Sequence, residues 1–141
     1  MTKEFWINLP VKDINKSKEF FLKLGFSPNP GMGNSDESTS VLIGNKKVVL
    51  MLFNEPTFKK FASNEIADTK KTTEVLFSID AESKEEVDEM SKKAREAGGT
   101  IFGEPKDNQG WMYGCGFADL DGHRWNVLYM DMGKMPGKVR V

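Results

Sequence analysis

The sequence predicts an α+β fold built from two similar modules, and three observations support this. A strand, a capped helix, a glycine and three further strands follow one another in this order, and the order occurs twice. The expected helix caps, Asp13 and Ser83, are about 70 residues apart, as in an internal duplication. In each module the first strand has one apolar face that the following helix can cover.

The length of the chain indicates one small domain, and its charge indicates that it does not bind nucleic acid or an anionic membrane. A chain of 141 residues can bury a sizeable core, and we expect one domain over residues 1–131. Its modules span about 4–53 and 73–131, followed by a loosely held tail over 132–141. Twenty basic and 21 acidic residues give a formal net charge of -1, which provides no electrostatic footprint for nucleic acid or an anionic membrane.

Cysteine content and the N-terminus indicate the compartment. Cys115 is the single cysteine, so no internal disulfide can form, and a reducing compartment is favoured. The sequence has neither an apolar signal core at its start nor an apolar run long enough to span a bilayer. We therefore expect a cytoplasmic protein.

The first module begins with a strand over Phe5–Val11. Asp13 is a good N-cap for a helix that runs to Leu24, because its carboxylate can accept from free amides of the first turn. Gly25 follows the helix and favours its termination. Three further strands are expected at Phe26–Pro28, Ser40–Ile43 and Lys47–Phe53.

The connection over Asn54–Thr72 has mixed character. Phe58, Phe61 and Ile66 lie among lysines and are compatible with a short amphipathic helix. Two interpretations stay open, a surface connection and a flap over a pocket.

The second module repeats the pattern after a strand over Thr73–Ile79. Ser83 and Glu86 form a capping box for a helix that ends at Gly98-Gly99. The sequence Asp121-Gly122 is a strong hairpin signal, because glycine takes the positive φ that such a turn needs. The remaining strands are expected at Thr100–Phe102, Gly110–Ala118 and Arg124–Met130.

The sheet faces that no helix covers carry mixed residues. If the two sheets curl toward each other, these faces line a shared cavity. Gly114 and Gly116 favour open space there, because they lack side chains. The alternative is that the apolar side chains on these faces close the core and leave no cavity; they are Trp6, Met51, Phe53, Leu76, Met112, Leu128 and Met130.

Several short segments together resemble one family, the vicinal oxygen chelate superfamily. It includes glyoxalase I, extradiol dioxygenases, fosfomycin-resistance enzymes and bleomycin-resistance proteins. The resemblance covers Trp6 to Met130 and is also found with bacterial proteins described as predicted lactoylglutathione lyases. It rests on Asn8–Asp13, Ser17 with Phe20-Phe21, Leu24–Phe26, Ala97–Gly99 and Asp119–Trp125.

The resemblance implies two βαβββ modules that form one curved mixed sheet around a central cavity, often in a homodimer. In its metal-dependent members four inward side chains bind the ion, and the matching positions here are Trp6, Met51, Glu74 and Asn126. Only Glu74 is an ordinary ligand, since indole lacks a free lone pair and thioether and amide groups bind hard divalent ions poorly. We therefore expect no cofactor, and a bound divalent metal is the alternative.

The predicted site follows from these inward positions. Glu74 is the candidate catalytic base if it faces the cavity; otherwise it is a rim carboxylate held by water or a lysine. Asn8 and Asn126 are polar contacts for a ligand, or satisfy neighbouring backbone groups. The predicted ligand-binding residues are Trp6, Asn8, Met51, Phe53, Glu74, Leu76, Met112, Gly114, Asn126 and Leu128.

Two further side chains have chemistry that a structural role can also explain. His123 is the single histidine and is expected to be a turn residue, with catalytic base as the alternative. Cys115 shares the strand face of Tyr113 and Phe117, which favours a buried inert thiol over a nucleophile.

Three functions are compatible with this sequence. The first is a metal-free protein that binds a small, partly apolar molecule, as in the bleomycin-resistance branch. The alternative is a metal-dependent enzyme similar to lactoylglutathione lyase or to a dioxygenase. The third is a protein whose sheet edge or basic tail mediates homodimerisation around a vestigial cavity. We favour the first, with a homodimer as the expected assembly.

Overall fold

The chain divides into two compact units, which a computed structural model describes over residues 1–31 and 33–136. The first unit spans Met1–Thr72 and the second Thr73–Val141. Of the predicted loose tail, residues 132–136 include a short 3-10 turn, η1 (Met132–Lys134), and residues 137–141 lie outside the described part.

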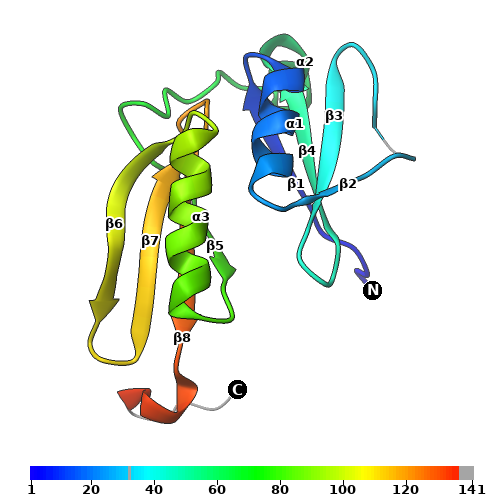
Figure 1. Cartoon of the computed structure of the whole chain (residues 1–141). Helices are drawn as coiled ribbons and strands as arrows, with labels where there is room; N and C mark the ends of the chain where they lie inside the picture. Colours follow the sequence, from blue (N-terminus) through cyan, green and yellow to red (C-terminus); the bar gives the residue numbers. More distant parts are fainter. Residues whose placement is uncertain (32, 137–141) are drawn as a thin grey trace. The chain divides into compact units, whose positions relative to one another are not determined.

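The first unit is a four-stranded sheet with two helices (Figure 1). The strand order is β1-β4-β3-β2, in which β1 runs parallel to β4 and the other pairs are antiparallel. Its elements are β1 (Trp6–Val11), α1 (Ile14–Lys23), β2 (Ser27–Pro28), β3 (Ser38–Ile43), β4 (Val48–Asn54) and α2 (Glu55–Ala62).

The second unit repeats this topology. Its order is β5-β8-β7-β6, again with the first and last strands parallel and the other pairs antiparallel. The predicted α+β class with two βαβββ modules is therefore confirmed. The elements are β5 (Leu76–Asp80), α3 (Lys84–Glu96), β6 (Thr100–Asn108), β7 (Met112–Ala118) and β8 (Arg124–Met130).

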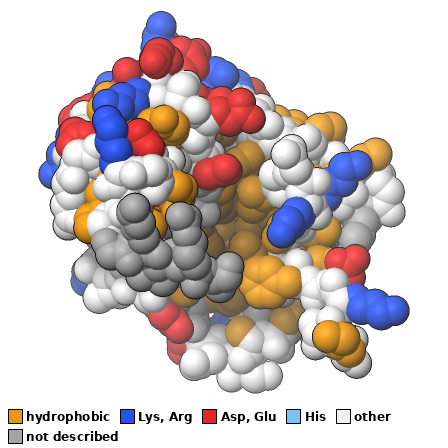
Figure 2. Space-filling model, turned by 90° about the horizontal axis from the view of Figure 1, so that it is seen from below, with side chains coloured by type: hydrophobic (Ala, Val, Ile, Leu, Met, Phe, Trp, Pro, Cys, Tyr) orange, Lys and Arg blue, Asp and Glu red, His pale blue; other side chains and the backbone are white. Residues whose placement is uncertain are grey.

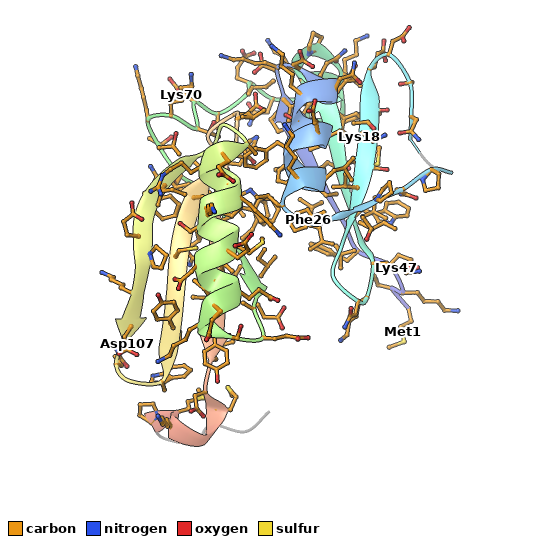
Figure 3. All side chains as sticks on the ribbon, in the orientation of Figure 1. Met1, Lys18, Phe26, Lys47, Lys70 and Asp107 are labelled. Carbon is orange, nitrogen blue, oxygen red and sulfur yellow. The ribbon has the colours of Figure 1, made fainter. Side chains whose placement is uncertain are left out.

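Helix α1 begins after the predicted cap, ends one residue before the predicted Leu24, and covers one face of its sheet. Asp13 accepts a hydrogen bond from the Lys16 amide at 3.0 Å, and Gly25 follows the helix with a φ of 104°. Phe20 and Phe21 are buried against β3 and β4, and Phe26 stacks on Phe21 with ring centroids 5.6 Å apart (Figure 3). These aromatic contacts form the centre of the first core.

Helix α3 packs in the same way on β6, β7 and β8. Ser83 accepts from the Glu86 amide at 3.1 Å, while the Glu86 carboxylate accepts from the amide of Glu82, one residue before the expected partner. Val87 and Ala94 of α3 are fully buried on the side of the helix that faces the sheet. The predicted capping box is thus present in a slightly wider form.

Cys115 lies on the strand face that α3 covers, as its predicted burial requires. Its thiol is 3.8 Å from the backbone oxygen of Val87 on α3. Burial, together with the nearby Asp88 carboxylate, raises the pKa of the thiol to about 11. Cys115 is therefore a protonated, inert thiol at neutral pH.

The turn between β7 and β8 is organised by the buried carboxylate of Asp119. It accepts hydrogen bonds from the amides of Asp121 and His123 and, at 3.1 Å, from Nε1 of Trp125. Gly122 has the predicted positive φ, 89°. Burial raises the pKa of the Asp119 carboxyl, while His123 and the three donors oppose that rise. His123 is buried in this turn, and its backbone amide donates to Asp119, which agrees with the structural role predicted for it.

Strand boundaries differ from the prediction in the second unit. Strand β5 begins at Leu76, not Thr73, so Glu74 precedes it. Strand β6 runs for nine residues, where Thr100–Phe102 was predicted. It tolerates Pro105 because it is the sheet edge. Gly103 and Pro105 are weak strand formers, so the sequence signal for a strand stops at Phe102 although exposure alternates through to Lys106.

The segment after β4 forms a shorter helix than expected. Asn54 caps α2 by accepting from the Thr57 amide, and α2 packs on β1 and β4 of its own unit. Phe61 contacts Phe53 with ring centroids 5.3 Å apart, although 73% of Phe61 stays exposed. Ile66 lies beyond the helix end, so it does not extend this apolar face.

Surface character agrees with the balanced composition. Acidic and basic side chains are interspersed on the face shown in Figure 2, without a region of one sign. Over residues 1–31 and 33–136, no helix combines the length and apolar character that crossing a membrane requires.

The hydrogen bonds of Asp119 should contribute to the free energy of unfolding. In Asp119→Asn the remaining oxygen can still accept from the two backbone amides, but an NH₂ group then faces the indole N–H of Trp125. Two donors face each other, so one buried hydrogen bond is lost. We expect the free energy of unfolding, measured by urea denaturation, to fall by about 1–3 kcal/mol. In a Trp125→Phe background, which lacks the donor, the same substitution should cost less. Equal costs in both backgrounds would contradict the assigned hydrogen bond.

Cys115 should react slowly while the chain is folded. At pH 8, a pKa near 11 in place of 9 lowers the thiolate fraction by about 100-fold. Labelling by a disulfide reagent should therefore be at least this much slower in the native protein than in urea. Native labelling at the rate of the unfolded chain would show that the thiol is not buried under α3.

Candidate ligand-binding site

One face of the second sheet carries a pocket of about 200 Å³. Helix α3 covers the opposite face, where Cys115, Phe117, Trp125 and Val127 are buried. Because side chains alternate along a strand, the even-numbered residues of β7 and β8 face the pocket. The lining residues are Phe102, Gly103, Glu104, Lys106, Asn108, Met112, Gly114, Gly116, Asn126 and Leu128, together with Cys115, which lies between the two glycines although its thiol contacts α3.

The register of β7 and β8 sets the floor of this pocket. Gly114 is the partner of Leu128, and Gly116 is the partner of Asn126. A Cβ at Gly114 would lie 2.7 Å from Leu128 Cδ2, and one at Gly116 would lie 2.5 Å from Phe102 Cζ. The space expected at the two glycines is therefore taken by neighbouring side chains, and the pocket lies beside them.

Strand β6 supplies polar side chains that the sequence analysis missed. Glu104 lines the pocket but is paired with Arg95 of α3 at 2.7 Å, so its charge is matched. Lys106 has no ion pair within the described part of the chain. The turn signal of Asp107, which accepts from the Gly110 amide, would have located the hairpin end and the length of β6 (Figure 3).

Arg124 is a second missed residue. Its guanidinium carbon lies 4.4 Å from the centroid of the Phe102 ring, a cation–π contact. Nε of Arg124 is buried and has no hydrogen-bond partner among residues 1–31 and 33–136. The signal available in the sequence was its position two residues before Asn126, which places both side chains on one strand face.

The predicted residues of the first unit lie on the sheet face away from α1. Asn8 is the register partner of Met51, and Trp6 is 51% exposed at the start of β1. Met51 is buried, and a Cβ on Gly33 would lie 2.6 Å from its Cε. A loop thus covers Met51, while Phe53 contacts Phe61.

The remaining two predicted residues precede or begin β5. Glu74 is exposed in a bend, and Leu76 is 51% exposed. Neither lines the pocket of the second sheet, which brings together four of the ten predicted ligand-binding residues, Met112, Gly114, Asn126 and Leu128. The predicted catalytic role of Glu74 has no geometric support within this pocket.

The donor set does not fit the metal that the resemblance implies. Within the described ranges, no three His, Cys, Asp or Glu side chains lie close enough to hold an ion. Of the four positions matched to metal ligands, Trp6, Met51 and Asn126 offer no imidazole, thiolate or carboxylate.

Comparison with known proteins identifies the family. Residues 5–127 match the Glyoxalase/Bleomycin resistance protein/Dioxygenase superfamily. No match was found among curated proteins. The chain is 34% identical to the hypothetical protein SA1046 of S. aureus, whose structure superposes with a TM-score of 0.79 over 92% of this chain and 94% of that one.

Two further solved structures share the fold at lower identity. A family enzyme from Burkholderia phytofirmans is 17% identical, with a TM-score of 0.75 over 89% of this chain and 96% of that one. The fosfomycin resistance protein FosX of Listeria monocytogenes, complexed with Mn(II) and sulfate, is 20% identical, with a TM-score of 0.67 over 92% and 91%. The sequence match, the 34% identity and the repeated topology agree, and this chain belongs to the glyoxalase/bleomycin resistance protein/dioxygenase superfamily.

Proposed function

We propose that this protein binds a small, partly apolar molecule in the pocket formed by β6, β7 and β8. The observation that carries the proposal is the position of Asn126. Asn126 lines the pocket together with the apolar side chains of Leu128 and Phe102, while the polar side chains of the wall otherwise come from β6. Small-molecule sites commonly combine apolar walls with a few placed polar groups.

The size of the pocket limits the ligand. About 200 Å³ is below the roughly 300–1,000 Å³ of sites that enclose drug-sized molecules. The pocket therefore suits a small ring or branched chain, or one end of a larger ligand. Met112 and Leu128 supply apolar contact for such a group, and Asn126 can donate or accept a hydrogen bond.

Six of the ten residues predicted from the sequence to contact a ligand do not line this pocket, and their role in binding stays a prediction. Trp6, Asn8, Met51 and Phe53 belong to the first unit, and Glu74 and Leu76 lie outside the pocket described above. The proposal depends on none of them. It also includes a cytoplasmic homodimer as the working form, which light scattering tests by the mass of the particle in solution.

A metal-dependent enzyme related to lactoylglutathione lyases or dioxygenases is the competing function. It needs about three strong ligands at one ion, and the donor chemistry at the matched positions does not provide them. The Mn(II) named for the Listeria protein belongs to that protein. Sequestration or recognition without a metal is the function that the side chains favour.

Binding should depend on the apolar wall. We expect para-cresol, a neutral probe, to shift the backbone amide signals of Gly114 and Gly116 in an NMR titration of the full chain. Leu128→Asn replaces an apolar contact with a polar one and should weaken binding about tenfold, equivalent to about 1.4 kcal/mol.

The matched control is Leu42→Asn, a half-buried strand leucine of the first unit. It should leave the affinity for para-cresol unchanged. Equal losses in both variants, or shifts confined to residues outside the pocket, would refute binding at this place.

Metal content separates the two functions. Protein purified without chelators should contain substoichiometric zinc, nickel, iron and manganese by mass spectrometry, because strong ligands are lacking at the matched positions. Chelator treatment should leave para-cresol binding unchanged. One tightly held transition metal per chain, with binding lost on its removal, would favour the enzyme.

A further inference from the structure

Arg124 lies against Phe102 of the pocket wall and has no ion pair among residues 1–31 and 33–136. Its Nε is buried without a hydrogen-bond partner within the described residues. Burial of an unpaired polar group is costly, so such groups in native structures call for an explanation. A ligand that supplies an acceptor is one explanation, and the surroundings of Arg124 support it.

The side chains of Arg124 and Asn126 lie on the same face of β8, the face that α3 does not cover. The two residues are separated by one position, so their side chains lie on one face with Cα atoms about 7 Å apart. Phe102 links Arg124 to the pocket, because its ring contacts the guanidinium and also lines the pocket wall. A group placed between Asn126 and Arg124 can therefore be reached by N–H donors from both.

The charges around the pocket favour an anion. Lys106 lines the pocket from β6, and it and Arg124 lack acidic partners in the described ranges. Two acids of this unit have partners of their own. Glu104 is paired with Arg95, and Asp119 accepts three hydrogen bonds in the β7–β8 turn.

Two acids of the segment that contains β5, Glu74 and Asp80, have no ion pair within residues 1–31 and 33–136. Glu74 is exposed, so water and salt screen its charge. Asp80 of β5 is four residues from Leu76, the register partner of Arg124. Four residues of strand span about 13 Å. That separation exceeds the Debye length of about 8 Å at physiological salt, so Asp80 does not neutralise Arg124.

We propose that the ligand is a small organic carboxylate, bound through its anionic group by Arg124 and Asn126, with its apolar body against Leu128 and Met112. This inference rests on the proposed binding function and specifies its ligand class. A carboxylate fits best because its two oxygens match the planar fork of the guanidinium. An organic body can also contact Leu128 and Met112, which a small inorganic anion cannot do.

The test compares benzoate with benzamide, which have the same shape and differ in charge. Each is titrated into the full chain at low salt while the amide signals of Gly114 and Gly116 are followed. We expect benzoate to bind about tenfold more tightly, because charge-assisted hydrogen bonds are roughly twice as strong as neutral ones. The preference should shrink as salt is added.

Arg124→Gln should remove the preference for benzoate, so that it weakens benzoate binding much more than benzamide binding. Arg124→Lys keeps the charge but not the fork and should retain part of the preference. Lys23→Gln is the charge-matched control on α1, where Lys23 pairs with Glu19, and it should behave as the wild type. If Arg124→Gln fails to fold, the wild-type preference, its salt dependence and Arg124→Lys still decide.

The experiment distinguishes a failure of the carboxylate proposal from a failure of the proposed binding function. Equal binding of benzoate and benzamide refutes the carboxylate and leaves the binding function in place. Absence of shifts with either probe refutes both. An equal loss for both probes in Arg124→Gln refutes recognition of the anion, because it assigns Arg124 a structural role only.

Discussion

The buried carboxylate of Asp119 is the constraint on which the candidate site depends. Its hydrogen bonds to Asp121, His123 and Trp125 fix the turn between β7 and β8. This turn sets the register between β7 and β8. A shift of one residue in that register would move the helix-facing side chains of β8 to the open face and the open-face side chains to the helix. The placement of Asn126 and Leu128 opposite Gly116 and Gly114 follows from this register.

The two units use one topology for different purposes. Both sheets have a helix on one face, and their strand orders are equivalent. In the first unit, however, the loop that contains Gly33 covers Met51 on the other face. In the second, the corresponding face carries a pocket with Phe102 and Arg124 at its edge. A duplicated framework has therefore diverged mainly in what lies on its open faces.

The sequence predicts the framework well because local signals agree with the tertiary structure. The caps Asp13 and Ser83 and the glycine after α1 each correspond to an observed hydrogen bond or dihedral angle, and the alternation in β8 corresponds to its burial pattern. The site is predicted less completely, for physical reasons. Gly103 and Pro105 are unfavourable in strands, so the sequence does not predict that β6 continues past Phe102, and Lys106 is missed with it. A ring stacked on a guanidinium, as in Phe102 and Arg124, leaves no periodic signal.

The central claim is that the open face of β7 and β8 binds a small molecule. Intermolecular NOEs between bound para-cresol and a methyl-labelled full chain test it most directly. The account predicts NOEs from the aromatic protons to the methyl groups of Met112 and Leu128. NOEs to methyl groups elsewhere in the chain, with none to these two residues, would contradict it.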